Sequence, residues 1–263
     1  MRKILFIFAF SIYGLLIAQN NWAEVDYTFK IRNDRVVTLD YSLLHDLKSN
    51  QSTYLFKEAV SGTDSVQIKN QDKFGSSTTN TLVYKETKET PEFQKYFEKD
   101  SLYSFSSIYG EKSYYVMTEK LPTFDWEIGN ETKEILGYQV QKATTHFRGR
   151  DYEAWFAPEI GISNGPYKFH GLPGLILDIH SKDGKYEFTA YGLKLNQKLE
   201  NFQIEHLLQK QKKSKKVSMK EMLVIQQKNI DNEIKYLSSK DPNALGATIE
   251  ITGIELDFSD VLD

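Results

Sequence analysis

The fold is decided by the stretch Gly171-Leu172-Pro173-Gly174-Leu175-Ile176-Leu177, in which two glycines and a proline lead straight into an apolar run. Proline fixes φ and glycine tolerates positive φ, so this backbone is directed through a specific turn into a strand. The strand runs to Asp183-Gly184, a pair suited to a type I′ hairpin turn. Pairing outward from that turn predicts Ile179 opposite Phe188, Leu177 opposite Ala190, Leu175 opposite Gly192, His180 opposite Glu187 and Asp178 opposite Thr189.

A second hairpin is predicted just upstream, with Arg148-Gly149 as the two central turn residues. Its apolar and charged side chains separate onto opposite faces, and a slip by one residue would place the charges in the core. This separation supports the register. The predicted pairs are Phe147 with Arg150, His146 with Asp151, Thr145 with Tyr152, Thr144 with Glu153 and Ala143 with Ala154.

The remaining chain predicts an α+β fold. Runs rich in Val, Thr, Tyr and Phe between Trp22 and about Trp126 are typical of antiparallel strands: Val25–Ile31, Arg35–Leu44, Ser52–Phe56, Asn80–Lys85 and Lys112–Thr118. Helices are predicted over Glu200–Lys213 and Ser218–Ser238, the second opening with the capping box Ser218-Met219-Lys220-Glu221, and a last strand over Ala247–Leu256. We therefore expect an antiparallel sheet, with helices at about residues 200–238.

The N-terminus predicts export. Arg2 and Lys3 precede the apolar run Ile4–Ile17, which is too short to span a bilayer and is followed by polar sequence. We expect residues 1–18 to be a signal peptide cleaved near Ala18, and residues 19–263 to form one periplasmic or secreted domain. The chain has no cysteine, a net charge of −3 and no further stretch of membrane-spanning length. This composition argues against a nucleic-acid partner and predicts no transmembrane segment in the mature chain.

The central region resembles the signature of the GLPGLI family of exported Bacteroidetes-type proteins, a family of unknown function. The resemblance rests on Gly149–Phe156, Gly165–His170 and Gly171–Leu177. It implies a single curved, half-barrel-like sheet, similar to lipoprotein-carrier folds, with helices covering part of the concave side. One departure is Val140, where many members carry a cysteine.

Candidate binding residues flank and occupy the loop from Pro158 to Gly174, which holds three of the six prolines. They are Arg150, Trp155, Tyr167, Phe169 and His170. One interpretation is a loop that contacts a ligand or a partner on a rigid scaffold. The alternative is that the loop plugs the sheet and its aromatic side chains are core. Arg148 and Arg150 suit an anion, although ion pairing, with Glu153 for Arg150, is the alternative.

Two histidine and carboxylate sets are predicted on the polar faces of the hairpins: His146 with Asp151 and Glu153, and His180 with Asp178 and Glu187. Such sets can ligate a metal, but ordinary cross-strand pairs have the same composition. No metal-binding spacing occurs in the sequence, and we predict no metal site and no cofactor.

No common catalytic motif occurs in the sequence: it has no Gly-x-Ser-x-Gly elbow, phosphate loop, dinucleotide fingerprint or cysteine nucleophile. The main hypothesis is a non-enzymatic periplasmic protein that binds an apolar or peptide-like ligand or an envelope protein partner. The alternatives are a periplasmic hydrolase that uses carboxylates or His170, and a metal-handling periplasmic protein.

Overall fold

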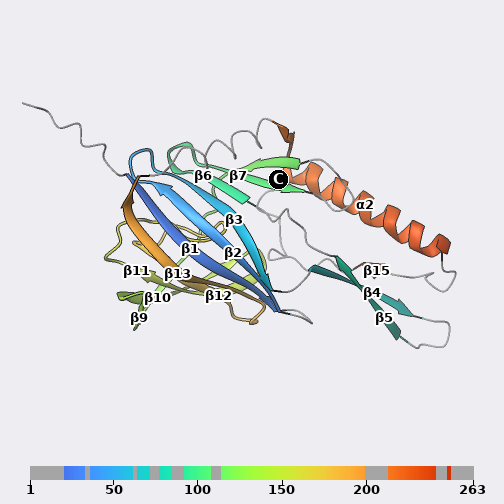
Figure 1. Cartoon of the computed structure of the whole chain (residues 1–263), viewed down its shortest axis with the longest axis horizontal. Helices are drawn as coiled ribbons and strands as arrows, with labels where there is room; N and C mark the ends of the chain where they lie inside the picture. Colours follow the sequence, from blue (N-terminus) through green and yellow to red (C-terminus); the bar gives the residue numbers. More distant parts are fainter. Residues whose placement is uncertain are drawn as a thin grey trace, which may run out of the picture.

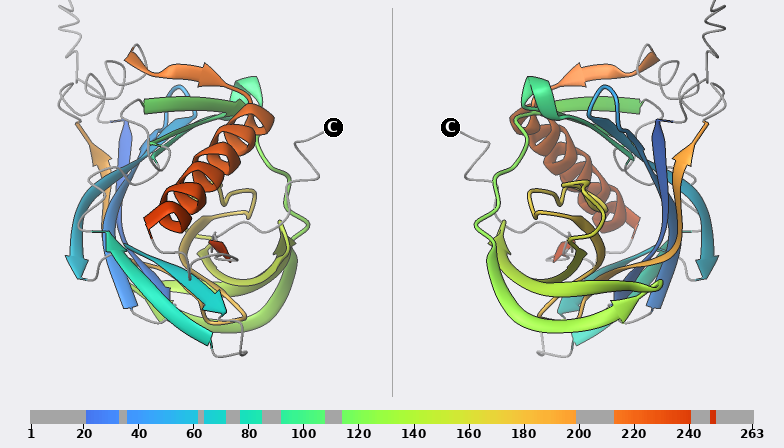
Figure 2. Two further views of the ribbon diagram at one scale, coloured as in Figure 1. Left: turned by 90° about the vertical axis from the view of Figure 1, so that its right-hand side faces the viewer. Right: turned by 90° about the vertical axis from the view of Figure 1, so that its left-hand side faces the viewer.

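The computed structural model describes residues 21–32, 36–61, 64–71, 77–84, 92–107, 114–198, 213–240 and 248–249. Twelve strands form one large sheet: β1 (Trp22–Arg32), β2 (Val36–Asp46), β3 (Gln51–Ser61), β6 (Glu92–Tyr96), β7 (Ser101–Ser107), β8 (Tyr114–Glu119), β9 (Glu127–Ile135), β10 (Tyr138–Phe147), β11 (Arg150–Ala157), β12 (Leu175–Ser181), β13 (Tyr186–Gln197) and β14 (Lys215–Val217). Their order is β14-β8-β7-β6-β3-β2-β1-β13-β12-β11-β10-β9, an open sheet that curves strongly (Figures 1 and 2).

Three further strands form a small second sheet of order β15-β4-β5: β4 (Asp64–Gln71), β5 (Ser77–Tyr84) and β15 (Thr248–Ile249). A 3₁₀ turn, η1 (Phe97–Lys99), joins β6 to β7, and the long helix is α2 (Met219–Lys240). Strand β14 runs parallel to β8, so the large sheet is not purely antiparallel. The expectation of a single sheet therefore holds for the main body but omits the second sheet.

The predicted register is confirmed for the whole β10–β11 hairpin and for the turn end of the β12–β13 hairpin. All five predicted pairs between β10 and β11 occur, from Phe147 with Arg150 to Ala143 with Ala154. Between β12 and β13 the pairs that hold are Ile179 with Phe188, His180 with Glu187 and Asp178 with Thr189. The predicted pairs Leu177 with Ala190 and Leu175 with Gly192 are wrong, because the pairing of the two strands ends at Asp178. The inner face of these hairpins is buried, as the separation of apolar and charged residues predicted.

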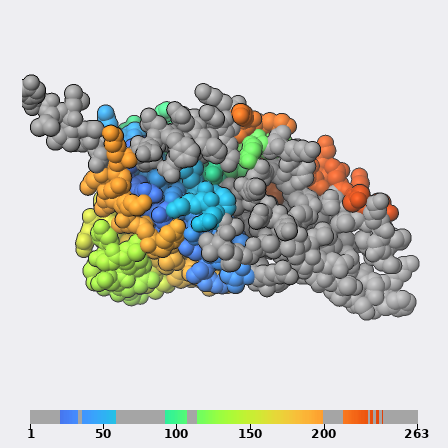
Figure 3. Space-filling view, in the orientation of Figure 1, coloured from blue at the N-terminus to red at the C-terminus, as the bar shows by residue number. Residues whose placement is uncertain are grey.

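The outer face of the sheet carries polar cross-strand pairs. Lys30 and Arg32 both pair with Glu187 across β1 and β13, and Lys194 pairs with Glu24. Figure 3 shows this face, with β13 in orange beside β1 in blue. Pairs of this kind satisfy charges in solvent and contribute little each, about 0–1 kcal/mol.

The loop between β11 and β12 fills the concave side of the sheet. It lies inside the curve in Figure 2, drawn in yellow. Phe169 and Leu172 are fully buried and share a cluster with Phe147, Tyr152 and Phe188 of the inner face. This loop, rather than a layer of helices, therefore forms the second layer of the core.

The prediction that helices cover the concave side is wrong for the described residues. Helix α2 contacts β8, β14 and β15 and projects away from the curved sheet (Figure 1). Among the side chains of α2 that the structure describes, Met219 and Met222 are buried, and Met222 packs against Tyr115 of β8. The aromatic side chains of the loop occupy the concave side instead. The helix predicted over Glu200–Lys213 and the strand predicted beyond Ile249 lie almost entirely outside the described residues.

The residues of the opening stretch meet a requirement of the local backbone. Gly171 has φ of +94°, and a Cβ at Gly174 would lie 2.2 Å from the carbonyl oxygen of Ala157. The indole nitrogen of Trp126 donates a hydrogen bond to the His170 carbonyl at 2.8 Å. Both glycines are therefore explained by how the loop enters β12. Within the described residues, none of the helices is long and apolar enough to span a membrane.

Candidate functional site

Two of the predicted binding residues lie in the core. Phe169 is fully buried, and its ring meets Tyr152 edge-on with centroids 4.8 Å apart. The Tyr167 ring meets Phe93 edge-on at 4.7 Å and stacks on Phe188 at 6.0 Å. The structure thus gives these two rings the position that the core interpretation of the loop expected.

His170 lies between two aromatic rings. Its ring meets Phe97 at 5.5 Å and Phe124 at 5.3 Å, both edge-on. Burial, followed by the nearby charge of Lys95, lowers the pKa of His170 to about 3, so the imidazole is neutral at pH 7. Its Nε2 is buried and has no hydrogen-bond partner in the described part of the chain.

The buried Lys95 of β6 holds the loop to the sheet. Its side chain is 0% exposed, and Nζ donates to Asn164 Oδ1 at 2.9 Å, Gly165 O at 2.9 Å and Phe169 O at 2.8 Å. These three oxygens match the three donors of an ammonium group. Burial lowers the pKa of Lys95 well below its usual range. The amide of Asn164 lies 3.1 Å from Nδ1 of His45, which extends the network to β2.

The two arginines of the hairpin turn are buried in ion pairs rather than presented to an anion. Arg148 pairs with Glu119 at 2.5 Å, and Lys168 pairs with the same carboxylate at 2.6 Å, with all three side chains at most 4% exposed. Arg150 pairs with Asp183, and its guanidinium lies 4.8 Å from the Tyr186 ring centre. Glu153, the partner expected for Arg150, instead pairs with Lys142 at 3.0 Å.

Trp155 lies on the outer face, away from the loop aromatics. Its indole nitrogen donates to Glu153 at 3.2 Å, and the ammonium of Lys133 lies 4.2 Å from its ring centre. The five predicted binding residues therefore do not form one surface: Tyr167, Phe169 and His170 line the core, whereas Arg150 and Trp155 lie elsewhere. Ligand binding by any of them stays a prediction.

The two histidine sets on the outer face form ion pairs, across strands for His146 and Asp151 and within β12 for His180 and Asp178. His146 Nδ1 lies 2.8 Å from Asp151, and His180 lies 3.3 Å from Asp178 and 3.8 Å from Glu153. The hydrogen bond with Asp178 raises the pKa of His180. In the part of the chain that the structure describes, no group of three or more His, Asp or Glu side chains is placed to hold a metal ion.

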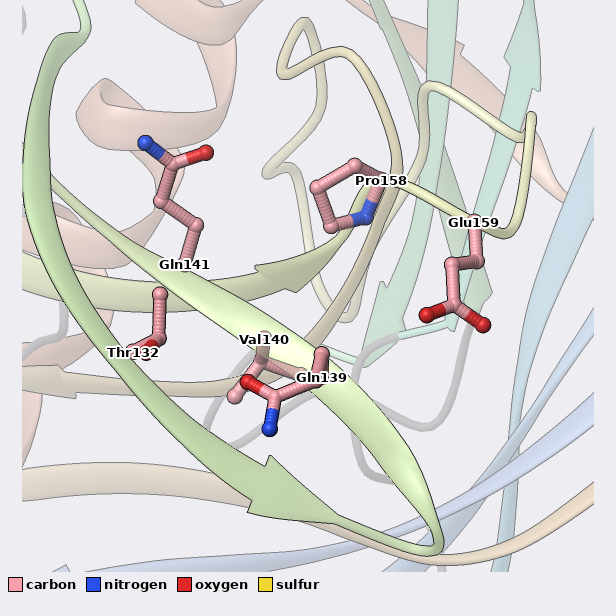
Figure 4. Close-up of a pocket in the computed structure, with 6 residues that line it drawn as sticks. All are labelled: Thr132, Gln139, Val140, Gln141, Pro158 and Glu159. Atoms are coloured by element: carbon pink, nitrogen blue, oxygen red, sulfur yellow. The ribbon is translucent and has the colours of Figure 1, made fainter.

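A hollow of about 210 Å³ opens between the β9–β10 hairpin and the start of the loop after β11 (Figure 4). It is lined by Thr132, Gln139, Val140, Gln141, Pro158 and Glu159. Gln141 Nε2 donates to Gly129 O at 2.7 Å, which fixes that amide. Among the described residues, no hydrogen bond or ion pair engages the side chain of Gln139 or Glu159. The hollow therefore offers free polar groups, in contrast to the paired charges of the outer face.

The sequence did not predict this hollow. Its polar side chains come from a hairpin and from a loop that are separate in the sequence, so no local spacing marks them. Pro158 and Glu159 begin the loop that the sequence predicted to be a binding loop. The aromatic residues predicted to bind, however, lie near the C-terminal end of that loop. The usable signal was the pair of glutamines beside a buried Val140.

Solved structures share the fold. Two of them, described as the structure of PNGF-II in P21 and in C2 space groups, match with TM-scores of 0.52 and 0.51 at 13% and 14% identity. Each match covers 80% of this chain but only 34% and 33% of the solved chain, so this chain spans about a third of their length. No curated protein matches the sequence.

The family comparison corrects the earlier resemblance. A family model described as "N-glycanase peptide, N-terminal domain" matches residues 59–227, and this match overturns the assignment to the GLPGLI family. The hypothesis of a non-enzymatic periplasmic protein that binds an apolar or peptide-like ligand or an envelope partner, with its hydrolase and metal-handling alternatives, is therefore also wrong. The GLPGLI-like stretch is explained by the close backbone approach at Gly174 rather than by that family. The chain belongs to the N-glycanase peptide, N-terminal domain family.

Proposed function

We propose that this chain is a non-catalytic domain that contacts the glycan of N-glycosylated polypeptides. The observation that carries the proposal is the family match over residues 59–227, since an N-glycanase acts on such glycans. The matched region includes the whole β9–β10 hairpin and the loop after β11. Export through the predicted signal peptide, which lies outside the described residues, would give the domain access to such substrates.

The hollow supports a contact with sugars. Sugar hydroxyl groups both donate and accept hydrogen bonds, and they need free polar partners on the protein. Gln139 and Glu159 provide such partners, and Thr132 adds a hydroxyl group. At about 210 Å³ the hollow is smaller than the roughly 300–1,000 Å³ of pockets for drug-sized ligands. It therefore suits one sugar unit rather than a long oligosaccharide.

The buried charges support a scaffold role rather than catalysis. The Glu119 carboxylate is neutralised by Arg148 and Lys168, and Lys95 uses all its donors on loop oxygens. His170 stays neutral over the physiological range. Groups committed in this way hold the core in place and are not available for proton transfer to a substrate.

The proposal is tested with two assays on the whole chain. Titration calorimetry with N-glycans released from a glycoprotein should give saturable binding, and Glu159→Gln combined with Gln139→Ala should weaken it at least tenfold. Glu127→Gln, an exposed carboxylate on β9, is the matched control and should bind as the wild type does. Incubation with an N-glycosylated protein should release no glycan.

Glycan release that survives purification would overturn the non-catalytic part of the proposal. Wild-type protein that binds no N-glycan at millimolar concentration would overturn the glycan contact itself. Circular dichroism of each variant distinguishes lost binding from lost folding.

A further inference from the structure

The methionines of the chain other than Met1 all lie where helix α2 meets the large sheet. The sequence has four methionines and no cysteine. Met117 belongs to β8, whereas Met219 and Met222 belong to the first turn of α2. Strand β14, which leads into α2, pairs with β8 and places Val217 beside Met117. Apart from Met1, the sulfur atoms of the chain are therefore confined to the two elements that meet at this junction.

Two of these methionines attach the described part of α2 to the sheet. Met219 and Met222 are 7% and 6% exposed, and no other side chain that the structure describes in α2 is buried. Met222 packs against Tyr115, and Met117 and Val217 border the same small apolar cluster. Beyond this first turn the helix projects away from the sheet (Figure 1). We call Tyr115, Met117, Val217, Met219 and Met222 the α2 seat.

A thioether undergoes a reaction with hydroperoxides that the other apolar side chains do not. The sulfur lone pair attacks the terminal peroxide oxygen, the O–O bond breaks, an S–O bond forms, and water or an alcohol leaves with the proton. The product, methionine sulfoxide, is polar and disrupts apolar contacts. Export, which the N-terminus predicts, would place the chain outside the reducing cytosol. Because Met117 is only partly buried, whereas Met219 and Met222 are buried, we expect a hydroperoxide to reach Met117 first.

We propose that the α2 seat is a methionine oxidation site, at which a hydroperoxide that oxidises Met117 releases the helix. The Met117 sulfoxide places a polar group beside the apolar contact between Met222 and Tyr115. Met219 and Met222 then become accessible, and their oxidation prevents α2 from packing again. Reductases convert a sulfoxide back to the thioether, so the release is reversible. The seat lies at the β14 edge of the large sheet and the hollow beside β9 at the other edge, so this release is separate from the proposed glycan contact.

Treatment of the whole chain with hydrogen peroxide tests the order of events. Peptide mass spectrometry should show one oxygen atom added to Met117 before Met219 and Met222 are oxidised. Amide hydrogen exchange in residues 223–240 should then become at least tenfold faster, while exchange in β1 and β13 stays unchanged. Methionine sulfoxide reductases should restore slow exchange in the helix.

Substitutions at one position isolate the role of Met117. Met117→Leu keeps the apolar volume but has no sulfur, so peroxide should oxidise Met222 at least fivefold more slowly and α2 should keep its slow exchange. Met117→Gln places a polar amide at the same position and should give fast exchange in α2 without peroxide. Val224→Leu, at an exposed position of α2, is the matched control and should respond to peroxide as the wild type does.

Three results would overturn the proposed site. Equal rates of Met222 oxidation in the wild type and in Met117→Leu would show that Met117 does not control access to the seat. Unchanged exchange in α2 after oxidation of Met117, Met219 and Met222 would show that their thioethers do not hold the helix. Faster exchange in β1 as well as in α2 would show that peroxide unfolds the whole domain. Met117→Leu keeps the test valid if Met117→Gln does not fold.

Discussion

At the residue scale, a few buried polar side chains hold the core together, and Lys95 is the main example. Lys95 sits on the inner face with Ser52 of β3 and Leu102 of β7 as its strand partners. No carboxylate is among the three oxygens that Lys95 contacts. The loop is therefore held by hydrogen bonds from Lys95 to two of its backbone carbonyl groups and one side-chain amide, all of them neutral acceptors.

Replacing Lys95→Met should destabilise the fold strongly. The change leaves the carbonyl oxygens of Gly165 and Phe169 buried without this donor, and Asn164 Oδ1 keeps only the Gly165 N–H; the loss costs about 2–5 kcal/mol in the free energy of unfolding. Urea denaturation measures this loss. Lys182→Met, at an exposed position, is the control and should change the free energy by less than about 0.5 kcal/mol. Equal effects of the two changes would contradict the role of Lys95.

Gly174→Ala should also destabilise the protein, for a steric reason. The new Cβ would meet Ala157 O at 2.2 Å and the Pro158 Cα at 2.9 Å, both of which are backbone atoms. Forcing them apart costs about 1–3 kcal/mol. Gly161→Ala is the matched control, since a Cβ there meets nothing within 4 Å. Thermal melting should separate the two variants, and a Gly174→Ala protein with an unchanged melting temperature would show that the backbone yields.

At the element scale, the sequence predicted the elements that alternate and missed those that do not. The β10–β11 and β12–β13 hairpins alternate between buried and exposed residues, which set their register in advance. Strand β6 escaped prediction because it is buried on both faces yet contains Gln94 and Lys95. Strand β9 escaped because it is exposed on nearly every residue and shows no period of two.

The same reasoning explains the mixed result for the candidate site. The sequence located the loop from Pro158 to Gly174, because proline and glycine mark it. It could not decide between a core and a binding role for the rings, because both use large aromatic residues. Only the contact of Pro158 and Glu159 with the β9–β10 hairpin reveals the hollow, and this contact depends on tertiary packing.

Helix α2 offers a test at this scale. The backbone N–H of Glu221 donates to Ser218 Oγ at 3.1 Å, and the backbone N–H of Ser218 donates to the Glu221 carboxylate at 2.7 Å, as the predicted capping box requires. Ser218→Ala should lower the stability of the helix by about 0.5–2 kcal/mol. Hydrogen exchange of the first-turn amides measures the change. Ser239→Ala at the opposite end is the control, and faster exchange there instead would contradict the role of the cap.

At the scale of the whole molecule, two buried histidines should make stability depend on pH. Burial lowers the pKa of His45 to about 4 and that of His170 to about 3. Because the unfolded chain takes up protons at these positions near pH 6.5, their contribution is complete above that pH. It is lost as the pH falls from about 6.5 towards 4.

Each histidine should contribute a slope of about 1.4 kcal/mol per pH unit within that window. His170→Phe keeps a ring between Phe97 and Phe124 but cannot titrate, so it should remove one such slope. Urea denaturation at pH 4.5, 5.5, 6.5 and 7.5 measures both proteins. Parallel pH profiles for the wild type and the variant would contradict this assignment.

Strand β9 lies at one edge of the large sheet, and this position affects how readily it opens locally. Among the described strands only β10 pairs with β9, so β9 is expected to open locally more readily than the strands inside the sheet. Its charges at Glu131, Lys133 and Glu134 discourage another chain from pairing there. A sugar bound between Thr132 and Glu159 would contact both the edge strand β9 and the loop after β11, and would hold the strand to the loop. Binding at the hollow would therefore register as slower amide exchange along β9, before any change in the core.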